Sequence, residues 1–435
     1  MSSRRWKTML GSGRDRRLVI SLSATTLLLW IGATAILPLL PVYLRHQGSS
    51  NALVGIIMAA YFAASVITQY PVGRLSDRLG RRPVVLGGLV VFAIGSLGFA
   101  GASQPLWAIA FRALQGIGAG SVTVASAAAI GTLVPLEARG GAFGALYGSQ
   151  MLAAAGGPLV GSVVGQSSMR SLFVGAAIAA VLAAGPVLAV LPAGRSSLPD
   201  PRGTEAGRGP LPTSFRGLMS KNRALFGVLV VFACGGCFGG MYETCWTLLL
   251  RARHAADFDV GLSWTLFALP YAALSVPAGW LANRLDRRLL AIGAMLWTAL
   301  FCALYPFIHA VALLIGLGFL EAVGTVAGNP PALLVLSETT PPALQGRAQG
   351  AVETARTAAM AAAAALSGAL FGLAPAIPFE LAAAIGVVAS AVVLASWRLV
   401  PQARAHRGRV GPELRAMLAA EAGSGSAEAP ARGGG

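Results

Sequence analysis

The amino-acid sequence predicts an all-α integral membrane protein with twelve transmembrane helices in two six-helix halves. Three observations support this prediction: apolar runs of membrane-spanning length, basic residues gathered in every second connection, and a pattern that recurs at a fixed interval. In the 435-residue chain, 55% of the residues are hydrophobic and only 11% are charged. One soluble core could not hide so much apolar surface, so we expect a lipid bilayer to cover the remainder.

Apolar runs of about 20 residues, the length that crosses a bilayer, recur along the whole chain. In the first part of the chain they cover residues 18–44, 52–72, 83–101, 106–133, 140–165 and 171–192. In the second part they cover residues 224–250, 260–282, 289–308, 311–336, 347–373 and 376–399. The first run has full spanning length and lacks the cleavage site of a secretory signal, so we expect it to be retained.

The basic residues lie mainly in alternate connections between these runs. The formal net charge is +17, and 27 of the 33 Lys and Arg residues fall on the side that also holds both chain ends. Because cytoplasmic loops carry an excess of Lys and Arg, this bias predicts that both termini are cytoplasmic. The bias also accounts for the net charge without nucleic acid as a partner, since no nucleic-acid-binding motif accompanies it.

The sequence contains an internal repeat. GWLANRLDRR at 279–288 aligns with GRLSDRLGRR at 73–82, and the same offset of 206 residues places Pro277 on Pro71 and Arg251 on Arg45. We therefore predict two related halves of like orientation. The predicted organisation is a cytoplasmic tail at 1–17, a first half at 18–192, a cytoplasmic linker at 193–222, a second half at 223–399 and a disordered cytoplasmic tail at 400–435.

Three motifs carry a family resemblance. The connection between the second and third runs reads GRLSDRLGRR and contributes Gly73, Asp77, Arg78, Gly80, Arg81 and Arg82. The fourth run contains Arg112-x-x-Gln115-Gly116-x-Gly118, and the fifth contains Gly157-Pro158-x-x-Gly161. Together with the repeat, these motifs resemble those of the Major Facilitator Superfamily over residues 18–399. The resemblance implies the fold of that superfamily, and the motif of the fifth run is similar to that of its drug/proton antiporters, which implies export.

The connection at 73–82 is a candidate gating loop. Topology alone explains its arginines, but the excess of positive charge on the inside does not call for the acid Asp77. The resemblance implies that Asp77 meets the N-terminus of the eleventh helix, near Gly346 and Arg347, and latches the halves together when the cytoplasmic side closes. A helix N-terminus stabilises a carboxylate. The second copy has Asn283 at this position, so we expect no equivalent latch in the other half.

Few ionisable residues lie within the predicted spans, and each costs about 2.5–3.5 kcal/mol or more at the centre of a membrane helix. Glu353 and Arg356 are three residues apart, so we expect them to pair with each other. Glu321 lies near the middle of the tenth run, at the position that Gln115 occupies in the first half. Since burial disfavours the charged form of a carboxyl group, we expect Glu321 to exchange a proton during transport.

Two further ionisable residues are candidates for proton coupling. Glu243 in the seventh run is the second acid, and the resemblance links Arg112 in the fourth run with proton transfer. For both acids the alternatives are a structural pairing with Arg112 or a direct contact with a cationic substrate. For Arg112 the alternative is a buried arginine that carbonyl groups or a nearby carboxylate hold in place.

In this superfamily, helices one, four, seven and ten line the substrate cavity. The polar and aromatic residues that we expect to contact the substrate are Trp30, Thr34, Gln115, Tyr242 and Asn329. The alternative for the aromatic residues is ordinary packing or contact with lipid.

Glycines of the fifth run recur every four residues on two nearly opposite faces. The sets are Gly140, Gly144, Gly148 and Gly157, Gly161, Gly165, and Pro158 lies between them. We expect one neighbour to pack closely against the cytoplasmic half of this helix and another against the outer half, with a bend at Pro158. The alternative is small-residue packing with no moving part.

No motif points to a metal, a cofactor or an enzyme. Cys234 and Cys237 have the spacing of a zinc or redox pair, but they lie in an apolar run without a second ligand pair or a nearby His. A phosphate loop, a nucleophile elbow and an HExxH sequence are absent from the sequence. We therefore predict no enzymatic activity.

The predicted function is proton-coupled export of drug-like or amphipathic small molecules across a bacterial plasma membrane by alternating access. The expected partners are the substrate, protons and the lipid bilayer, and we expect a monomer. One alternative is a narrow-specificity metabolite or sugar exporter, or a proton-coupled importer, of the same fold. Another is a membrane sensor or assembly factor that keeps the fold without transporting.

Overall fold

The computed structural model describes residues 13–102, 104–165, 168–192, 223–340 and 345–398. All regular secondary structure within these ranges is helical. The predicted linker at 193–222, the predicted tail at 400–435 and most of the predicted tail at 1–17 lie outside the described residues. The side chain of Arg347, which we expected near Asp77, also lies outside them.

The first part of the chain forms six long helices and one short one. They are α2 (Gly13–Ile36), α3 (Leu40–His46), α4 (Asn51–Leu79), α5 (Arg81–Ala100), α6 (Pro105–Leu133), α7 (Leu136–Gly165) and α8 (Met169–Val190). The first predicted run is thus divided between α2 and α3. Pro38 lies in the turn between them and Pro41 lies in the first turn of α3. Proline lacks a backbone donor, so these two residues end one helix and begin the next.

The second part of the chain repeats this pattern with one additional break. Its elements are α10 (Arg223–Ala252), α11 (Asp257–Ala282), α12 (Arg287–Leu304), the 3-10 turn η1 (Tyr305–Phe307), α13 (Val311–Thr325), α14 (Asn329–Thr339), α15 (Gln345–Leu373) and α16 (Ile377–Ser396). The sequence predicted one continuous helix at 311–336, and this was wrong. Pro330 and Pro331 begin α14 and leave a short gap after α13.

Ten spans in the described residues are long and apolar enough to cross a membrane, with α13 and α14 counted together. The helices α7 and α11 are not among them, so length and composition support ten of the twelve predicted spans. Large apolar side chains point outward along these helices; Ile67, Leu106 and Leu289, for example, are about 70% exposed. Apolar side chains on the outer surface of a multi-span helical protein are the expected contacts with lipid.

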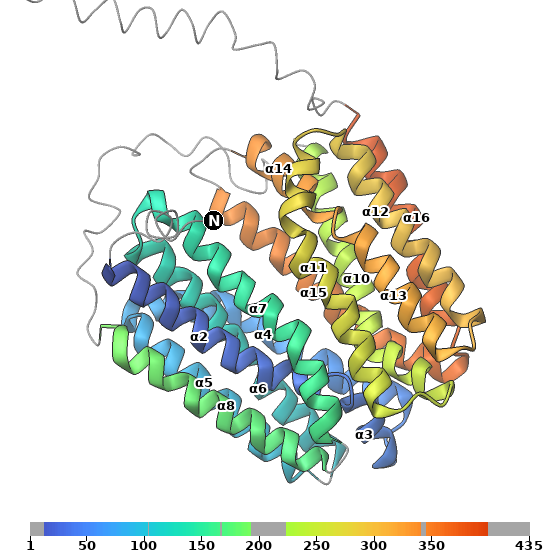
Figure 1. The fold of residues 1–435 in the computed structure, drawn as a ribbon, viewed down its shortest axis with the longest axis horizontal. Coiled ribbons are helices and arrows are strands. Elements are labelled where there is room, and N and C mark those ends of the chain that lie inside the picture. Colours follow the sequence, from blue (N-terminus) through green and yellow to red (C-terminus); the bar gives the residue numbers. More distant parts are fainter. Residues whose placement is uncertain (1–12, 103, 166–167, 193–222, 341–344, 399–435) are drawn as a thin grey trace, which may run out of the picture.

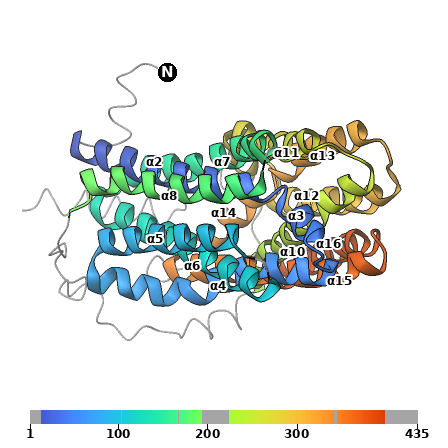
Figure 2. The ribbon, with the colours of Figure 1, turned by 90° about the horizontal axis from the view of Figure 1, so that it is seen from below.

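The helices form two groups that lie side by side. Figure 1 shows α2, α5, α6 and α8 in one group and α10, α12, α13 and α16 in the other, and Figure 2 shows the same two groups from below. The groups meet where α4 packs against α15 and α7 against α11. At Gly55 the backbone of α4 approaches Ala364 and Gly368 of α15 so closely that an added methyl group would collide with them. Small residues allow such close contact between membrane helices.

The two ends of the helix bundle differ in charge. One end, here the basic end, holds the connections α4–α5 and α11–α12, with Arg78, Arg81, Arg82, Arg284, Arg287 and Arg288. The other end, here the far end, holds the connections α3–α4 and α10–α11. The contacts between the halves at Gly55 and Gly261 lie one turn from the far end. The halves therefore touch closely at the far end.

A hydrogen bond that recurs in both halves supports the internal repeat. Arg45 donates to the carbonyl oxygen of Ser49 at 2.8 Å, and Arg251 donates to that of Ala255 at 2.7 Å. Both members of the second pair lie 206 residues after their counterparts. Each arginine thus fixes the turn after the first predicted span of its half.

Candidate functional site

A buried carboxylate with two tyrosine partners lies inside the second half. Glu321 of α13 is fully buried. The Tyr242 hydroxyl lies 2.8 and 2.9 Å from its two carboxylate oxygens, and the Tyr305 hydroxyl donates to Oε2 at 2.6 Å. The Tyr242 hydroxyl also lies 3.2 Å from the sulfur of Cys302. These four residues are called the Glu321 site below.

Helix ends and ring packing position the two tyrosines. The helix α12 ends at Leu304, and the tight turn η1, which contains Pro306, carries the Tyr305 ring into the interior. This ring packs against Trp246 with 4.9 Å between ring centroids. Tyr242 lies one helical turn before Trp246 on α10, and their rings meet edge to face. The packed rings hold both hydroxyls toward Glu321.

The Glu321 site has hydroxyl donors but no cation. Among the described residues, no Lys, Arg or His side chain pairs with Glu321. The two phenolic hydroxyls offer one proton each to the charged carboxylate, which satisfies part of its hydrogen-bonding capacity. A protonated carboxyl group carries a donor of its own and has fewer acceptor sites, so protonation changes how the two tyrosine hydroxyls can bond to it. The site can therefore change its hydrogen-bond pattern with its charge.

A cationic cluster occupies the equivalent region of the first half. The Arg112 side chain of α6 is 1% exposed and donates from Nη1 to Gln115 Oε1 at 3.0 Å. Gln115 donates in turn to the hydroxyl of Ser96 on α5 at 3.0 Å. The guanidinium lies 4.7 Å above the Tyr61 ring of α4. These four residues are called the Arg112 site below, and its hydrogen bonds occupy Gln115 within the first half.

Glu243 adjoins the Glu321 site along α10 and interacts with the Arg112 site. It follows Tyr242 directly on α10, and its carboxylate interacts electrostatically with Arg112 and Tyr61 of the other half. Within the described residues, no ion pair joins Glu243 to Arg112. Its Oε2 is enclosed and has no hydrogen-bond partner in the described part of the chain. The predicted alternative, a structural pairing with Arg112, is therefore not formed as an ion pair in the described part of the chain.

The five predicted substrate contacts do not come together as one group. Tyr242 and Gln115 belong to the Glu321 and Arg112 sites. Thr34 donates to the carbonyl oxygens of Ala153 and Trp30, so it joins α2 to α7. Trp30 is half-buried, and its Nε1 is enclosed without a partner among the described residues. Asn329 is exposed at the first residue of α14.

The loop motif is exposed at the basic end. Asp77 pairs with Arg81 at 2.6 Å, and its side chain is 70% exposed. Gly80 ends α4 with a φ of 97°, a backbone conformation that favours glycine. Arg82 donates to the carbonyl oxygen of Leu191 and so ties α5 to the end of α8. The predicted connection at 73–82 is therefore mostly helical, and Asp77 near the end of α4 pairs with the first residue of α5 in this conformation.

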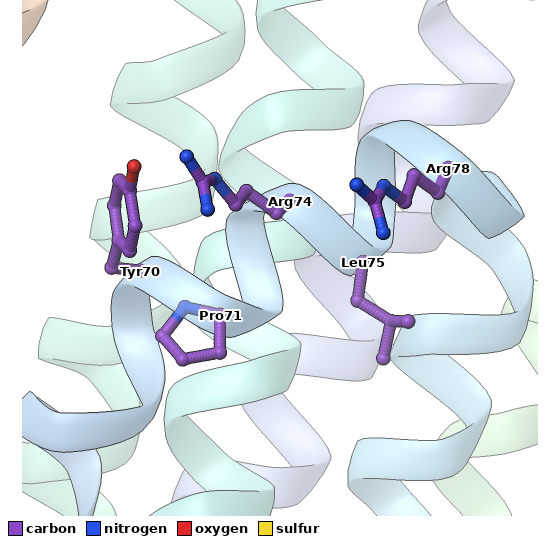
Figure 3. A pocket seen from close by; sticks show the side chains of 5 residues that line it. All are labelled: Tyr70, Pro71, Arg74, Leu75 and Arg78. Carbon is purple, nitrogen blue, oxygen red and sulfur yellow. The ribbon is translucent and has the colours of Figure 1, made fainter.

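A small open pocket lies beside this loop on α4 (Figure 3). Its lining residues are Tyr70, Pro71, Arg74, Leu75 and Arg78. The Arg74 guanidinium lies 4.6 Å above the Tyr70 ring, which is a cation–π contact. None of the predicted coupling or substrate residues lines this pocket.

The glycine pattern of α7 is close-packed in one half of the helix only. Methyl groups added at Gly157, Gly161 and Gly165 would collide with Thr34, Ala35 and Leu39 of the first span. Methyl groups at Gly144 and Gly148 would have no neighbour within 4 Å among the described residues. The expected close neighbour of the far half is present, whereas the part of the chain that the structure describes places no close neighbour at Gly144 and Gly148. The helix also runs through Pro158 without interruption.

The predicted pair within α15 is confirmed. Arg356 and Glu353 form an ion pair at 2.6 Å, and both side chains are nearly half exposed. This pairing follows from their spacing of three residues on one helix.

Tyr305, Tyr61, Ser96 and Cys302 were not predicted. The repeat contained a signal for two of them, because the offset of 206 residues relates Ser96 to Cys302 as it relates Gln115 to Glu321. A search of both halves for polar residues at matching positions would have found this pair. Tyr305 follows a helix end whose position the apolar pattern did not define, since the predicted run continued to residue 308.

Comparisons with known proteins agree with this architecture. A model of the Major Facilitator Superfamily matches residues 22–252 and 245–424. The inner membrane transport protein YajR of Escherichia coli is 43% identical over 107 residues, which cover 24% of this chain and 23% of that protein. The class E tetracycline resistance protein of Escherichia coli is 32% identical over 277 residues, 61% of this chain and 66% of that protein. Each match thus spans less than two thirds of the relative's length.

Solved structures share the fold at low sequence identity. A bacterial homolog of the human lysosomal transporter Spinster, in an inward-facing and unoccupied conformation, matches with a TM-score of 0.68 and 15% identity, covering 89% of this chain and 99% of that one. The nucleoside transporter NupG matches with a TM-score of 0.70 and 12% identity, covering 88% and 100%.

Proposed function

Because the chain belongs to the Major Facilitator Superfamily of membrane transporters, we propose that it is a secondary active transporter that exports drug-like or amphipathic small molecules in exchange for protons. The observation that carries this proposal is Glu321, a buried acid with two hydroxyl donors and, among the described residues, no paired cation. A membrane acid in this setting is a functional candidate because its burial is costly.

Glu321 is the proposed proton carrier. The charged carboxylate is expensive to bury without a cation, and a proton is the smallest ion that can neutralise it. Proton uptake changes the hydrogen bonds of Tyr242 and Tyr305, which connect α13 with α10 and η1. A proton at Glu321 would therefore favour a different packing of these elements, which is what coupling to a conformational change requires.

Two observations support export of amphipathic molecules. The Gly157-Pro158-x-x-Gly161 motif resembles that of drug/proton antiporters, and its glycines pack α7 closely against α2. Two relatives are tetracycline resistance proteins, of class E from Escherichia coli and class H from Pasteurella multocida. The match to the second is 34% identical over 164 residues, 37% of this chain and 40% of that protein.

The proposed orientation places the basic end in the cytoplasm of a bacterial cell. The halves touch at the far end, and Asp77 is exposed at the basic end, which corresponds to a conformation closed toward the outside. In the opposite conformation, Asp77 would leave Arg81 and meet the start of α15.

Asp77→Asn should then slow transport several-fold without reducing the amount of protein in the membrane, as efflux rates normalised to an immunoblot would reveal.

Efflux from cells tests the proposal. Cells that express the wild type, Glu321→Gln or Glu380→Gln are loaded with rhodamine 6G or with tetracycline, and accumulation is followed with and without an uncoupler. Glu380→Gln is the matched control, because Glu380 is an exposed acid in the first turn of α16. Wild type and control should accumulate less of at least one probe than empty cells, and the uncoupler or Glu321→Gln should remove the difference.

The opposite outcomes identify the alternatives. Equal accumulation in all cells for both probes would contradict export of this substrate class. Inverted membrane vesicles expose their cytoplasmic face to the medium, so an exporter accumulates the probe inside them. Proton-driven release of the probe from such vesicles would indicate an importer. Efflux that survives both the uncoupler and Glu321→Gln would contradict proton coupling.

A further inference from the structure

We propose that Arg112 and Glu243 form a binding site, shared by the two halves, for a dipolar small molecule that carries one anionic and one cationic group. The anionic group would bind the free edge of Arg112 and the cationic group would bind Glu243. This inference rests on the proposed transport function and names the substrate class.

The Arg112 guanidinium is fixed with one edge unused. Its Nη1 bonds to Gln115, which Ser96 holds in place, and the Tyr61 ring covers one face. Its Nε and Nη2 are enclosed and have no partner in the part of the chain that the structure describes. The N–H groups of Nε and Nη2 point the same way along one edge of the guanidinium plane. Two parallel donors of this kind match the two oxygens of a carboxylate.

Glu243 supplies the opposite charge from the other half. Its Oε2 is also enclosed and without a partner among the described residues. The two charged groups attract each other without forming an ion pair within the described part of the chain. Buried charges normally satisfy their hydrogen-bonding atoms through a partner. Two donor nitrogens of Arg112 and one acceptor oxygen of Glu243, contributed by different halves, thus have no partner among the described residues. We take this to indicate that a ligand completes the site.

The charge balance selects a dipolar ligand. A simple cation would pair with Glu243 and leave the positive charge of the buried Arg112 uncompensated. A simple anion would pair with Arg112 and leave the negative charge of Glu243 uncompensated. A molecule with both charges pairs with both groups and adds no net charge to a buried region. It would also connect α6 of one half with α10 of the other, and Glu243 adjoins Tyr242 of the Glu321 site. Ligand binding and the proton site therefore share one turn of α10.

Binding to the purified full-length protein tests the inference. The probes are rhodamine B, a zwitterion with a free carboxylate, and its ethyl ester, a cation of nearly the same shape. Fluorescence anisotropy in detergent, corrected with protein-free micelles, gives the dissociation constant of each. The wild type should bind the zwitterion at least about tenfold more tightly than the ester, the effect of one charge-assisted hydrogen-bond pair. Equal affinity for both probes would overturn the proposal.

Variants assign the two charges. Arg112→Gln should remove the preference for the zwitterion, and Glu243→Gln should weaken the binding of both probes about tenfold. Glu380→Gln is the control and should bind like the wild type. Retention of the preference in Arg112→Gln, or of both affinities in Glu243→Gln, would refute the site. Size-exclusion chromatography checks that each variant is folded, and if Arg112→Gln is not recovered, Glu243→Gln decides the question.

The binding assay needs no proton gradient, so it separates this inference from the proposed function. A zwitterion preference that depends on Arg112, in a protein whose efflux ignores the uncoupler, would support the site and contradict proton coupling. Uncoupler-sensitive efflux by a protein that binds both probes equally would support proton coupling and contradict the proposed binding site.

Discussion

The two halves hold different chemistry at matching positions. In the first half, Gln115 of α6 bonds to Ser96 of α5 and to Arg112. In the second half, the residues 206 positions later are Glu321 of α13 and Cys302 of α12, and Tyr242 bridges them. A permanent cation stabilises the first arrangement, whereas hydroxyl groups stabilise the second. Within the described residues, the same scaffold thus holds a fixed charge in one half and an acid without a paired cation in the other.

A glycine explains why the second half holds no cation at this point. The residue that matches Arg112 is Gly318 of α13. A methyl group added there would lie 3.6 Å from the Trp246 ring and 4.0 Å from the Tyr305 hydroxyl. The aromatic side chains around Glu321 therefore occupy the direction in which an arginine would extend. The two halves therefore differ in the packing of aromatic side chains at this point as well as in having Gly318 at the position of Arg112.

Removing both hydroxyls of the Glu321 site should have the largest effect. In Tyr242→Phe/Tyr305→Phe the rings remain and Glu321 loses both donors, so the charged carboxylate would be left unpaired. Each charge-assisted hydrogen bond contributes about 1.5–3 kcal/mol. We expect uncoupler-sensitive efflux to fall to the level of cells without the protein, measured at matched membrane expression. Efflux above half of the wild-type rate would contradict the role of this site.

Tyr305→Phe alone makes the second half resemble the first, because Phe99 occupies the matching position. It removes the 2.6 Å hydrogen bond and keeps the ring packed against Trp246. We expect efflux to slow several-fold, since Tyr242 still donates to Glu321. Tyr43→Phe is a matched control, because the Tyr43 hydroxyl accepts a hydrogen bond from Gln47 at an exposed position. An equal effect of both substitutions would argue against a specific role for Tyr305.

Ser96→Ala tests the Arg112 site of the first half. The substitution removes the acceptor of Gln115 and should lower the free energy of unfolding by about 1 kcal/mol, since the Gln115 amide stays buried. A thermal unfolding curve of the purified protein measures this change. Efflux should remain uncoupler-sensitive, because the acid lies in the other half. Loss of uncoupler sensitivity in Ser96→Ala would contradict the assignment of proton coupling to Glu321 in the second half.

The smallest effects on efflux are expected at the two arginines that close matching turns. Arg45→Ala and Arg251→Ala each remove one hydrogen bond to a carbonyl oxygen and should each lower stability by about 0.5–1.5 kcal/mol. Arg251 also pairs with Asp257, so its substitution should cost the larger amount. Melting temperatures of both variants check this order. A larger loss in Arg45→Ala would show that the two turns are not equivalent.

The sequence predicted features that depend on spacing along the chain. Apolar runs located the spans, and a spacing of three residues predicted the pair of Glu353 and Arg356. Glu321 stood out because an isolated acid in an apolar run is costly. The division of the tenth run at Pro330 and Pro331 was missed, although proline at the start of a helix is a known signal.

Contacts between distant parts of the chain could not be predicted. Thr34 faces Ala153 of α7, and Tyr305 reaches Glu321 because a 3-10 turn carries its ring inward. Both depend on how helices pack against each other, which periodicity within one helix does not define. Tyr242 was predicted as a substrate contact of helix seven, and in the structure its hydroxyl bonds to Glu321 within the second half.

The most direct test of the account compares two transport modes in proteoliposomes that contain the wild type or Glu321→Gln. One mode is accumulation of the exported probe driven by a pH gradient, and the other is exchange of labelled for unlabelled probe without a gradient. If Glu321 carries the proton, the variant should lose gradient-driven accumulation and keep exchange, because only the first requires the acid to gain and release a proton. Gradient-driven accumulation at the wild-type rate in Glu321→Gln would contradict the account.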